Sequence, residues 1–296
     1  MFFIVGKMTH RWNAIRLLSV VLLACFSLFF IYNTILPVYG HVASNNNSCD
    51  ATTEMSTRNV SGERLDPNEI SFLNWNIYKG QGEDWQQDLT QFAQNHQLMT
   101  IQEALLDDTL TELLHSHDVN WTMHRAFYLK DVSAGVINVA STEALQSCGF
   151  RVNEPLIRVP KSALVSYYAI EGSEEKLLVA NIHSVNFSLG LRSYRKQLTM
   201  LYDALADHKG PMIVAGDFNS WSKSRLQEVN DLVVKLSLSR LEHGMTGKTE
   251  VFGNAIDHVF YRQLEVLSNE VLRVTSSDHN PISVSFKYLA VPLKTI

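Results

Sequence analysis

The stretch Gly210-Pro-Met-Ile-Val-Ala-Gly-Asp-Phe-Asn219 organises the interpretation of the whole sequence. Its apolar residues, 212–215, predict a short buried strand that breaks at a glycine and delivers Asp217 and Asn219 to its end. Both residue types disfavour strands, and an ionised carboxylate beside an apolar run costs free energy unless a partner meets it. Side chains two residues apart on a strand share one face, so we expect the carboxylate and the amide to converge on a polar ligand. A polar turn that closes a core strand is the alternative for this stretch alone.

Composition and charge are those of a globular protein of 296 residues, with 46% hydrophobic and 19% charged residues. The formal net charge is -5. Residues 1–40 contain Lys7, Arg11 and Arg16 and no acid, so the rest of the chain carries -8. This excess of acids is not the electrostatic footprint of a high-affinity nucleic-acid binder. A partner that brings divalent cations fits better, because a cation offsets a local cluster of carboxylates.

The N-terminal region predicts a membrane anchor. Residues 17–40 contain no charged residue, and about 20 apolar residues suffice to cross a bilayer. Basic residues lie only on the N-terminal side, in 1–16, until Arg58, so the positive-inside rule places 1–16 in the cytoplasm and the rest outside. We therefore predict a single-pass membrane protein whose folded domain is extracytoplasmic. A cleaved signal peptide and a buried helix are the alternatives for 17–40, and the buried helix would allow a cytoplasmic protein.

The three cysteines, Cys25, Cys49 and Cys148, do not form a metal-binding motif, because no pair has metal-ligand spacing. Cys25 lies inside the apolar run. Cys49 and Cys148 could pair only in an oxidising compartment.

The folded domain is expected over 69–290, after a polar linker, 41–68, that is rich in Asn, Ser and Thr and lacks apolar periodicity. Helices are expected from Asp84 to about His96, from Asp107 or Asp108 to about His117, over 190–208 and over 226–236. Strands are expected at 69–78, 98–103, 123–129, 135–141, 150–152, 163–168, 176–183, 212–215, 256–261, 265–274 and 281–288. Because strands and helices mix without strict alternation, two packed sheets with helices outside accommodate the pattern best.

Polar residues stand at the ends of apolar strands at six places in this domain. Each ending alone has an ordinary explanation, such as a capped turn or a satisfied buried histidine. Together they indicate a site, because burying acids, amides and imidazoles is costly unless they meet one another or a ligand. The six endings are Asn74 with Asn76, Gln102 with Glu103, Asn181 with His183, Asp217 with Asn219, Asp257 with His258, and Asp278 with His279 and Asn280.

These residue types form a coherent set for phosphate-ester hydrolysis. A glutamate and amides hold a hard cation such as Mg²⁺, and the cation stabilises negative charge on a phosphoryl oxygen. An aspartate orients or deprotonates water, and a histidine backed by an aspartate exchanges a proton near neutral pH. The sequence contains no P-loop, His-Glu-x-x-His, Gly-x-Ser-x-Gly or dinucleotide fingerprint, so the chemistries of those motifs are unsupported.

The order of these motifs resembles the signature of the endonuclease/exonuclease/phosphatase superfamily, which includes DNase I-like nucleases, inositol polyphosphate 5-phosphatases and neutral sphingomyelinases. The resemblance covers about 69–288. Within the superfamily, the runs Glu154–Val165 and Asn181–Gly190 look like those of the YafD-like bacterial proteins. The motifs that carry the resemblance are Asn74-Trp-Asn76-Ile, Gln102-Glu103, Asn181-Ile-His183, Gly216-Asp-Phe-Asn219, Ile256-Asp-His-Val-Phe260 and Ser277-Asp-His-Asn-Pro281.

The resemblance implies an α+β fold, a four-layer αββα sandwich with the site at one edge, here preceded by one N-terminal hydrophobic helix. It also implies a site for Mg²⁺ (or Mn²⁺), in which Glu103 binds the ion with Asn76 and Asp278 close by.

The resemblance implies catalytic roles for five further residues. Asp217 would orient or activate the attacking water, and Asn219 would hold the scissile phosphate. His279 would contact a phosphate oxygen, with Asp257 supporting a histidine. His183 matches the histidine that donates a proton in the DNase I-like members.

The leading hypothesis is a divalent-metal-dependent hydrolase of phosphate esters, more specifically a phosphodiesterase. The expected substrate is a nucleic acid or a lipid headgroup. Residues 17–40 are expected to insert in the membrane, and no protein partner is predicted. A non-catalytic binding module that retains the fold is the alternative.

Overall fold

The computed structural model divides the chain into two compact units, 1–41 and 42–296. In the first unit only residues 21–23 are described, and they are helical. The predicted transmembrane helix over 17–40 otherwise lies outside the described residues and stays a prediction. Within the part of the chain that is described, no helix has the length and apolar character needed to cross a membrane. The described residues are 21–23, 53–56 (backbone only), 64–155, 157–188, 190–241 and 245–290.

The second unit is built on two large sheets. The seven-stranded sheet has the order β1-β4-β5-β3-β2-β15-β14, and the six-stranded sheet has the order β10-β13-β9-β8-β7-β6. The strands of the first are β1 (Thr53–Ser56), β2 (Ile70–Asn76), β3 (Leu98–Leu106), β4 (Asn120–Leu129), β5 (Val132–Ala140), β14 (Leu264–Val271) and β15 (Ile282–Tyr288). Those of the second are β6 (Gln146–Asn153), β7 (Pro160–Ala169), β8 (Lys176–His183), β9 (Met212–Asp217), β10 (Ser239–Arg240) and β13 (Asp257–Arg262), and a hairpin joins β11 (Glu250–Val251) to β12 (Asn254–Ala255).

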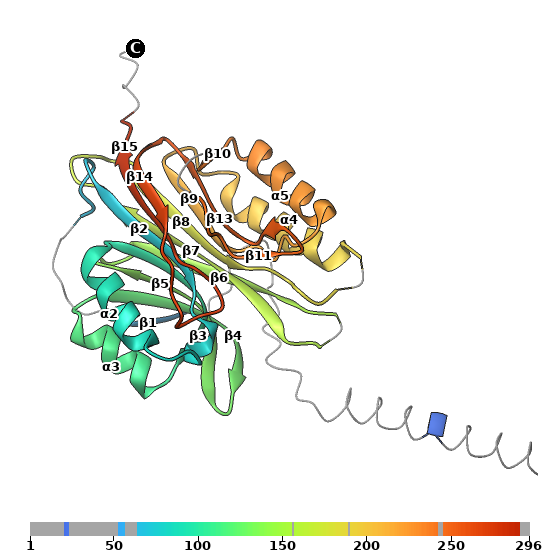
Figure 1. The fold of residues 1–296 in the computed structure, drawn as a ribbon. Coiled ribbons are helices and arrows are strands. Elements are labelled where there is room, and N and C mark those ends of the chain that lie inside the picture. The colour runs from blue at the N-terminus through green and yellow to red at the C-terminus, as the bar shows by residue number, and fades with distance from the viewer. Residues whose placement is uncertain are drawn as a thin grey trace, which may run out of the picture. The chain divides into compact units, whose positions relative to one another are not determined.

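Helices cover the outer face of each sheet. The helices α2 (Trp85–Asn95) and α3 (Asp108–Ser116) pack on the seven-stranded sheet, and α4 (Arg192–Leu205) and α5 (Lys223–Lys235) pack on the six-stranded sheet (Figure 1). A short 3-10 turn, η1 (Tyr78–Gly80), follows β2. The four-layer αββα sandwich is therefore confirmed.

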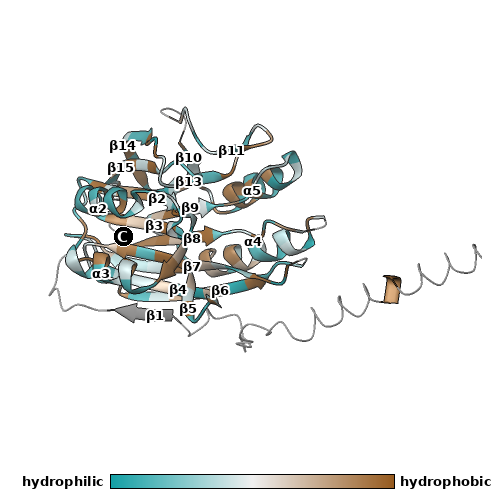
Figure 2. Ribbon diagram, turned by 60° about the horizontal axis from the view of Figure 1, so that its bottom comes forward, coloured by the Kyte–Doolittle hydropathy of each residue, from teal (hydrophilic) through white to brown (hydrophobic). Residues whose placement is uncertain are grey.

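Three apolar clusters hold the layers together, one under each helix pair and one between the sheets. Strand alternation divides β9 between two of them, because Met212 and Val214 face the helices whereas Ile213 and Ala215 face the other sheet. Figure 2 shows that the central strands carry much of the apolar character and the helices expose a hydrophilic side. Asp217 continues the face of Ile213 and Ala215, so it emerges where the inter-sheet core ends.

In three of the predicted polar endings one residue serves the fold rather than the site, namely Asn74, Gln102 and Asn181. Gln102, on the seven-stranded sheet, donates from Nε2 to Oδ1 of Asn74 (3.0 Å) and to Oδ1 of Asn181 (2.8 Å), which belongs to the six-stranded sheet. The Asn181 amide donates in turn to the carbonyls of Ile101 (3.2 Å) and Ile137 (3.0 Å). These buried amides therefore link the two sheets, and the hydrogen bonds offset the cost of burying them.

The predicted elements are largely found, with two local differences. Residues 53–56, inside the expected linker 41–68, form an edge strand paired with β4, and Leu65 is fully buried. The folded unit thus extends to the N-terminal side of Glu69. The sequence did not reveal this strand, because an edge strand needs only backbone pairing and gives no apolar periodicity. Asp84 does not cap α2, since its backbone is left-handed (φ 62°) and its side chain accepts no capping bond. Asp107 does cap α3, accepting from the backbone N–H of Leu110 at 2.9 Å.

Gly216 is required by the close approach of β8 to β9. Its φ is +148°, and a Cβ at this position would lie 1.9 Å from the carbonyl oxygen of Ile182. We predict that Gly216→Ala lowers the free energy of unfolding by about 3 kcal/mol or more, since backbone strain adds to the overlap. Thermal or denaturant unfolding of the purified domain measures the change.

Gly172→Ala is the matched control, because Gly172 also has a positive φ (+69°) but nothing lies within 4 Å of its added Cβ. Its expected cost is about 1 kcal/mol, from the backbone conformation alone. Equal losses in the two variants would show that the contact with Ile182 is unimportant.

Candidate active site

Strand register places three of the predicted catalytic residues in one row. On the central strands of the six-stranded sheet, Asp217 pairs with His183 of β8 on one side and with Asp257 of β13 on the other. All three are buried, and each continues the inter-sheet face of its strand. The row therefore meets the end of the seven-stranded sheet, where Asn76 and Glu103 lie.

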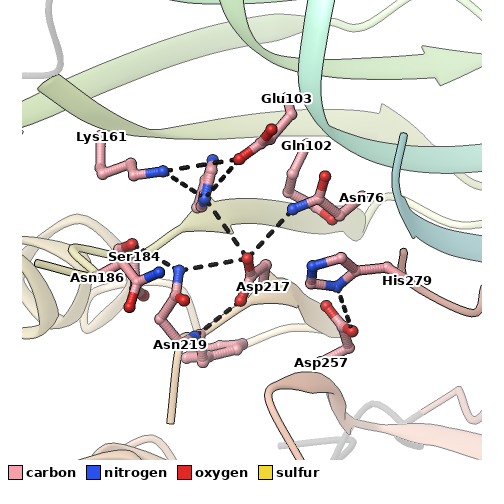
Figure 3. A network of polar contacts seen from close by, with 12 residues as sticks. Asn76, Gln102, Glu103, Lys161, Ser184, Asn186, Asp217, Asn219, Asp257 and His279 are labelled. Carbon is pink, nitrogen blue, oxygen red and sulfur yellow. Dashed lines mark hydrogen bonds and ion pairs between the residues drawn. The ribbon is translucent and has the colours of Figure 1, made fainter. Parts of the chain in front are cut away.

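Asp217 is the centre of the polar network (Figure 3). Its carboxylate accepts from the Asn76 amide of the opposite sheet (3.2 Å), from the backbone N–H of Asn219 (2.8 Å) and from the Asn219 amide (3.3 Å). Nε2 of His183 lies 3.5 Å from the same carboxylate. The sequence therefore identified correctly a carboxylate and an amide that converge on one point.

Asn219 reaches Asp217 by a turn and not by strand alternation. The strand ends at Asp217, Phe218 is buried in the core, and Asn219 has a left-handed backbone (φ 46°) that returns its side chain toward the carboxylate. The Asn219 amide also donates to the carbonyl of Ser184 at 3.0 Å. A left-handed non-glycine residue costs about 1–3 kcal/mol, and such residues cluster at functional sites.

Arg225, on α5, holds this turn from behind. Its guanidinium is buried and donates to the carbonyls of Asn219 (3.0 Å), Val185 (2.6 Å) and Asn186 (2.7 Å). It also lies over the rings of Tyr194 and Trp221. A buried arginine that satisfies several loop carbonyls fixes the backbone on which Asn219 depends. The sequence reasoning did not find Arg225, because helical spacing alone does not show that an arginine faces inward.

Glu103 enters the site through a β-bulge. Alternation along β3 would turn Glu103 away from the inter-sheet face that Gln102 occupies, but the register shifts between Ile101 and Ala104 and Glu103 has φ 55°. A bulge re-aims a side chain in this way. The carboxylate forms an ion pair with Lys79, which follows β2 and is itself left-handed (φ 55°).

Lys161 is a second lysine that the sequence analysis did not single out. It extends from the start of β7, and its Nζ donates to Nε2 of His183 at 2.7 Å and lies 3.8 Å from Glu103. Its pKa is lowered, since burial outweighs the attraction of Glu103, Glu154 and Asp217. A lysine near the end of a strand is ordinarily solvated. Only the packing of the two sheets therefore reveals that Lys161 faces the site.

The two histidines differ in their electrostatic environment. Burial, then the charges of Lys161, His279 and Lys79, hold the pKa of His183 well below its usual range. His279 donates from Nδ1 to Asp257 at 2.7 Å. Burial alone would lower the pKa of His279, but the Asp257 charge and hydrogen bond, with Asp217 and Asp278, outweigh it and raise the pKa to about 10. At neutral pH the site therefore holds one neutral and one protonated imidazole.

Asp278 lies at the periphery of the site. Its side chain is 57% exposed, and its nearest charged neighbour is Nε2 of His279 at 3.9 Å. The structure therefore brings Asn76, His183, Asp217, Asn219, Asp257 and His279 into one buried group, with Glu103 at its edge and Asp278 outside it. His258, next to Asp257, points away and contacts Ser220 at 2.8 Å.

Two sets of side chains offer metal ligands. Among the described residues, Asp217, Asp257 and His279 have ligand atoms within 4.8 Å of one another, but the Asp257–His279 hydrogen bond already uses part of that set. Glu103 offers a carboxylate that two lysine ammonium groups face. Asn76, which also lines the cavity, offers an amide oxygen that accepts from the backbone N–H of Tyr78 at 3.1 Å. Carboxylate and amide oxygens suit a hard cation such as Mg²⁺, and the Glu103 carboxylate already pairs with the ammonium group of Lys79.

The site opens into a cavity of about 790 Å³. Asp217, Asn219, His279 and Glu103 line its inner end, and apolar side chains form much of its wall. A volume in this range is typical of small-molecule sites.

Comparison with known proteins agrees with this arrangement. The model of the Endonuclease/Exonuclease/phosphatase family matches residues 73–279. The chain belongs to this family. Its relatives include a UPF0294 protein of Vibrio campbellii, 40% identical over 74% of this chain and 77% of that protein. Another, from Yersinia enterocolitica, is 39% identical over 72% of this chain and 82% of that protein. The predicted resemblance to the YafD-like proteins is confirmed.

Solved structures of the family share the fold. An endonuclease/exonuclease/phosphatase family protein from Bacteroides thetaiotaomicron superposes with a TM-score of 0.60 at 16% identity, over 74% of this chain and 98% of that one. ANGEL2, described as a 2′,3′-cyclic phosphatase, superposes with a TM-score of 0.58 at 15% identity, over 75% of this chain and 96% of that one. At these identities the likeness shows the fold alone.

We predict that Asp217→Asn stabilises the folded domain at neutral pH. Desolvation raises the pKa of Asp217 to about 6, against 3.8 for a free aspartate, although His279 opposes the shift. The folded state therefore binds this proton more tightly than the unfolded state does. The contribution of the Asp217 carboxyl to stability consequently falls as the pH rises from 3.8 to 6, and it stays low above pH 6. Removing the charge should raise the free energy of unfolding by roughly 1–3 kcal/mol at pH 7.5, measured by thermal unfolding.

The stability gained by Asp217→Asn should shrink as the pH falls from 6 toward 4, because the Asp217 carboxyl of the folded wild-type protein is then protonated. A lower melting temperature for Asp217→Asn at pH 7.5 would contradict the interpretation that the buried carboxylate costs stability.

Proposed function

We propose that this protein is a divalent-metal-dependent hydrolase of phosphate esters, specifically a phosphodiesterase. One observation carries the proposal: a buried carboxylate, Asp217, lies between an amide turn and a protonated His279–Asp257 pair at the inner end of an open cavity. Family membership supports the general class of reaction. ANGEL2 and a mannosyl-6-phosphatase from Bacteroides thetaiotaomicron, which share the fold, are both described as phosphatases.

Asp217 would act on the attacking water. Above about pH 6 its carboxylate is ionised and already oriented by the Asn219 N–H and the Asn76 amide. It would accept a hydrogen bond from the water and take its proton as the oxygen bonds to phosphorus. Asn219, adjacent to it, would turn the amide N–H that now faces Asp217 to a phosphate oxygen and hold the phosphorus in line.

His279 would stabilise and protonate the departing side. Because Asp257 binds Nδ1 and keeps the imidazole protonated, Nε2–H is available to a phosphate or leaving oxygen. As the phosphorus–oxygen bond breaks, this proton passes to the leaving alkoxide. His183 stays neutral, so its ring carries no extra proton to give. A proton delivered from this side of the cavity would come from Lys161, which is hydrogen-bonded to His183.

Glu103 and Asn76 would hold the Mg²⁺ (or Mn²⁺) ion, with Asp278 at the margin. When bound, the ion would stabilise negative charge on the phosphoryl oxygens. Lys79 now faces Glu103, so it would have to leave that carboxylate when an ion binds.

The proposal predicts hydrolysis of bis-p-nitrophenyl phosphate in the presence of Mg²⁺ and its loss with a chelator. Asp217→Asn and His279→Ala should each lower kcat/KM by about 100-fold or more, which is the usual scale for a general base or acid. Release of p-nitrophenol measures turnover, and thermal unfolding verifies that each variant is folded.

The matched control is His117→Ala, because His117 lies at the C-cap of α3 and does not line the cavity. It should hydrolyse the diester like the wild type. Absence of turnover in the wild type, together with no calorimetric binding of Mg²⁺, would favour the alternative of a non-catalytic binding module.

The protein's location is a further part of the proposal. Cys148, on β6, is disulfide-bonded, and the other two cysteines, Cys25 and Cys49, lie outside the described residues. Disulfides persist mainly in oxidising compartments, which supports an extracytoplasmic domain behind the predicted anchor at 17–40.

A topology reporter fused after Ile296 tests this placement. A reporter that is active only outside the cytoplasm should give signal, and one that is active only in the cytoplasm should be silent. The reverse pattern would place the domain in the cytoplasm.

A further inference from the structure

Exposed apolar side chains gather around the mouth of the cavity. Leu129, Ile157, Phe187 and Phe252 line the cavity, and each is also exposed to solvent. They come from four separate segments: the β4–β5 hairpin, the β6–β7 loop, the segment between β8 and α4, and the turn between β11 and β12. We call these four residues the apolar rim. Because scattered single apolar residues are normal on a surface, the convergence of four loops on one mouth is the informative feature.

The rim is continuous with the inner wall of the cavity. Trp221 lies between the turn of Asn219 and the rim, with its ring edge-on to Phe252 at 6.1 Å between centroids. Val159, Pro160 and Ile256 also line the wall. Phe252 is 85% exposed and Phe187 is 53% exposed, so a large apolar area at the entrance has no cover among the described residues. An apolar group joined to a phosphate at Asp217 would reduce that exposure.

The charges of the cavity argue against a nucleic-acid strand as the occupant. A strand carries one phosphate per nucleotide and is bound by basic side chains that follow its backbone. The cations among the described lining residues are Lys79, Lys161 and the protonated His279, and all three lie at the inner end beside Glu103 and Asp217. The lining therefore provides charge for a single phosphate, and apolar surface for whatever is attached to it.

We propose that the apolar rim binds an alkyl chain, so that the substrate is a lipid-like phosphate ester whose phosphate lies at Asp217. This inference rests on the proposed function for the reaction, but the rim would bind an alkyl phosphate whether or not turnover occurs. The chain leaves the inner end of the cavity past Trp221 and contacts Phe187 and Phe252 at the mouth.

Binding is measured first, by calorimetric titration of methyl phosphate and octyl phosphate in the presence of Mg²⁺, below the concentration at which octyl phosphate forms micelles. We expect octyl phosphate to bind at least about tenfold more tightly. That ratio corresponds to the burial of about two added methylene groups at about 0.8 kcal/mol each. Turnover is measured next, as kcat/KM for methyl and octyl p-nitrophenyl phosphate, and the same ratio is expected.

Phe187→Ser combined with Phe252→Ser should reduce the octyl-to-methyl ratio to about 1–3, because the removed rings provide the contact. The matched control is Val234→Ser, since Val234 is 76% exposed on α5 and does not line the cavity. This control should keep the wild-type ratio.

Each other outcome separates the two proposals. Turnover with equal constants for both esters, and equal binding of both phosphates, would overturn the alkyl site and leave the phosphodiesterase. Tighter binding of octyl phosphate without turnover of either ester would support the alkyl site and overturn the phosphodiesterase. If the double rim variant lost affinity for a short oligothymidylate but kept the octyl-to-methyl ratio, the rim would be a base-stacking surface and the proposal would be wrong.

Discussion

Burial of the Asp217 carboxylate is the constraint on which the site depends. An ionised group at the end of an inter-sheet core is stable only when neighbouring groups are positioned to donate hydrogen bonds to it. Asn76 reaches it from the opposite sheet, Asn219 from a left-handed turn, and His183 from the neighbouring strand. The two donors, Asn76 and Asn219, belong to different parts of the chain, so the carboxylate receives its hydrogen bonds only when both sheets are packed. The remaining cost is visible in the raised pKa of Asp217, and perturbed pKa values of this kind cluster at functional sites.

The surroundings of Asp217 also separate two histidines that look alike in sequence. His279 is held protonated by its hydrogen bond to Asp257, whereas Lys161 and burial keep His183 neutral. A phosphoryl-transfer site gains from this division, because a proton acceptor and a proton donor are then available at the same pH. Two lysines face the Glu103 carboxylate, so this carboxylate is already paired with positive charge at the edge of the site.

Four residues with a left-handed backbone lie where these side chains converge. Tyr78, Lys79, Glu103 and Asn219 all have positive φ, and they belong to three different segments. The rest of the fold stabilises them, through the amide links between the sheets and through Arg225 behind the Asn219 turn. The site is thus rigid at its inner end, while the loops at the mouth present apolar side chains to solvent. A rigid reaction centre with an apolar entrance suits a substrate whose phosphate is fixed and whose remainder is recognised by burial.

The sequence by itself determined most of the strands, the layers and the order of polar endings, because apolar periodicity and strand-terminal acids and amides are local features. Within these endings it could not distinguish the residues that link the sheets, Asn74, Gln102 and Asn181, from the neighbours that face the site. Asn74 shares a strand face with Asn76, and Asn181 shares one with His183, so alternation does not separate them. Only the tertiary structure showed that a bulge turns Glu103 into the site and that Lys161 and Arg225 approach it from other strands and helices. The physical reason is that these contacts join residues far apart in the chain, and long-range packing leaves no local pattern.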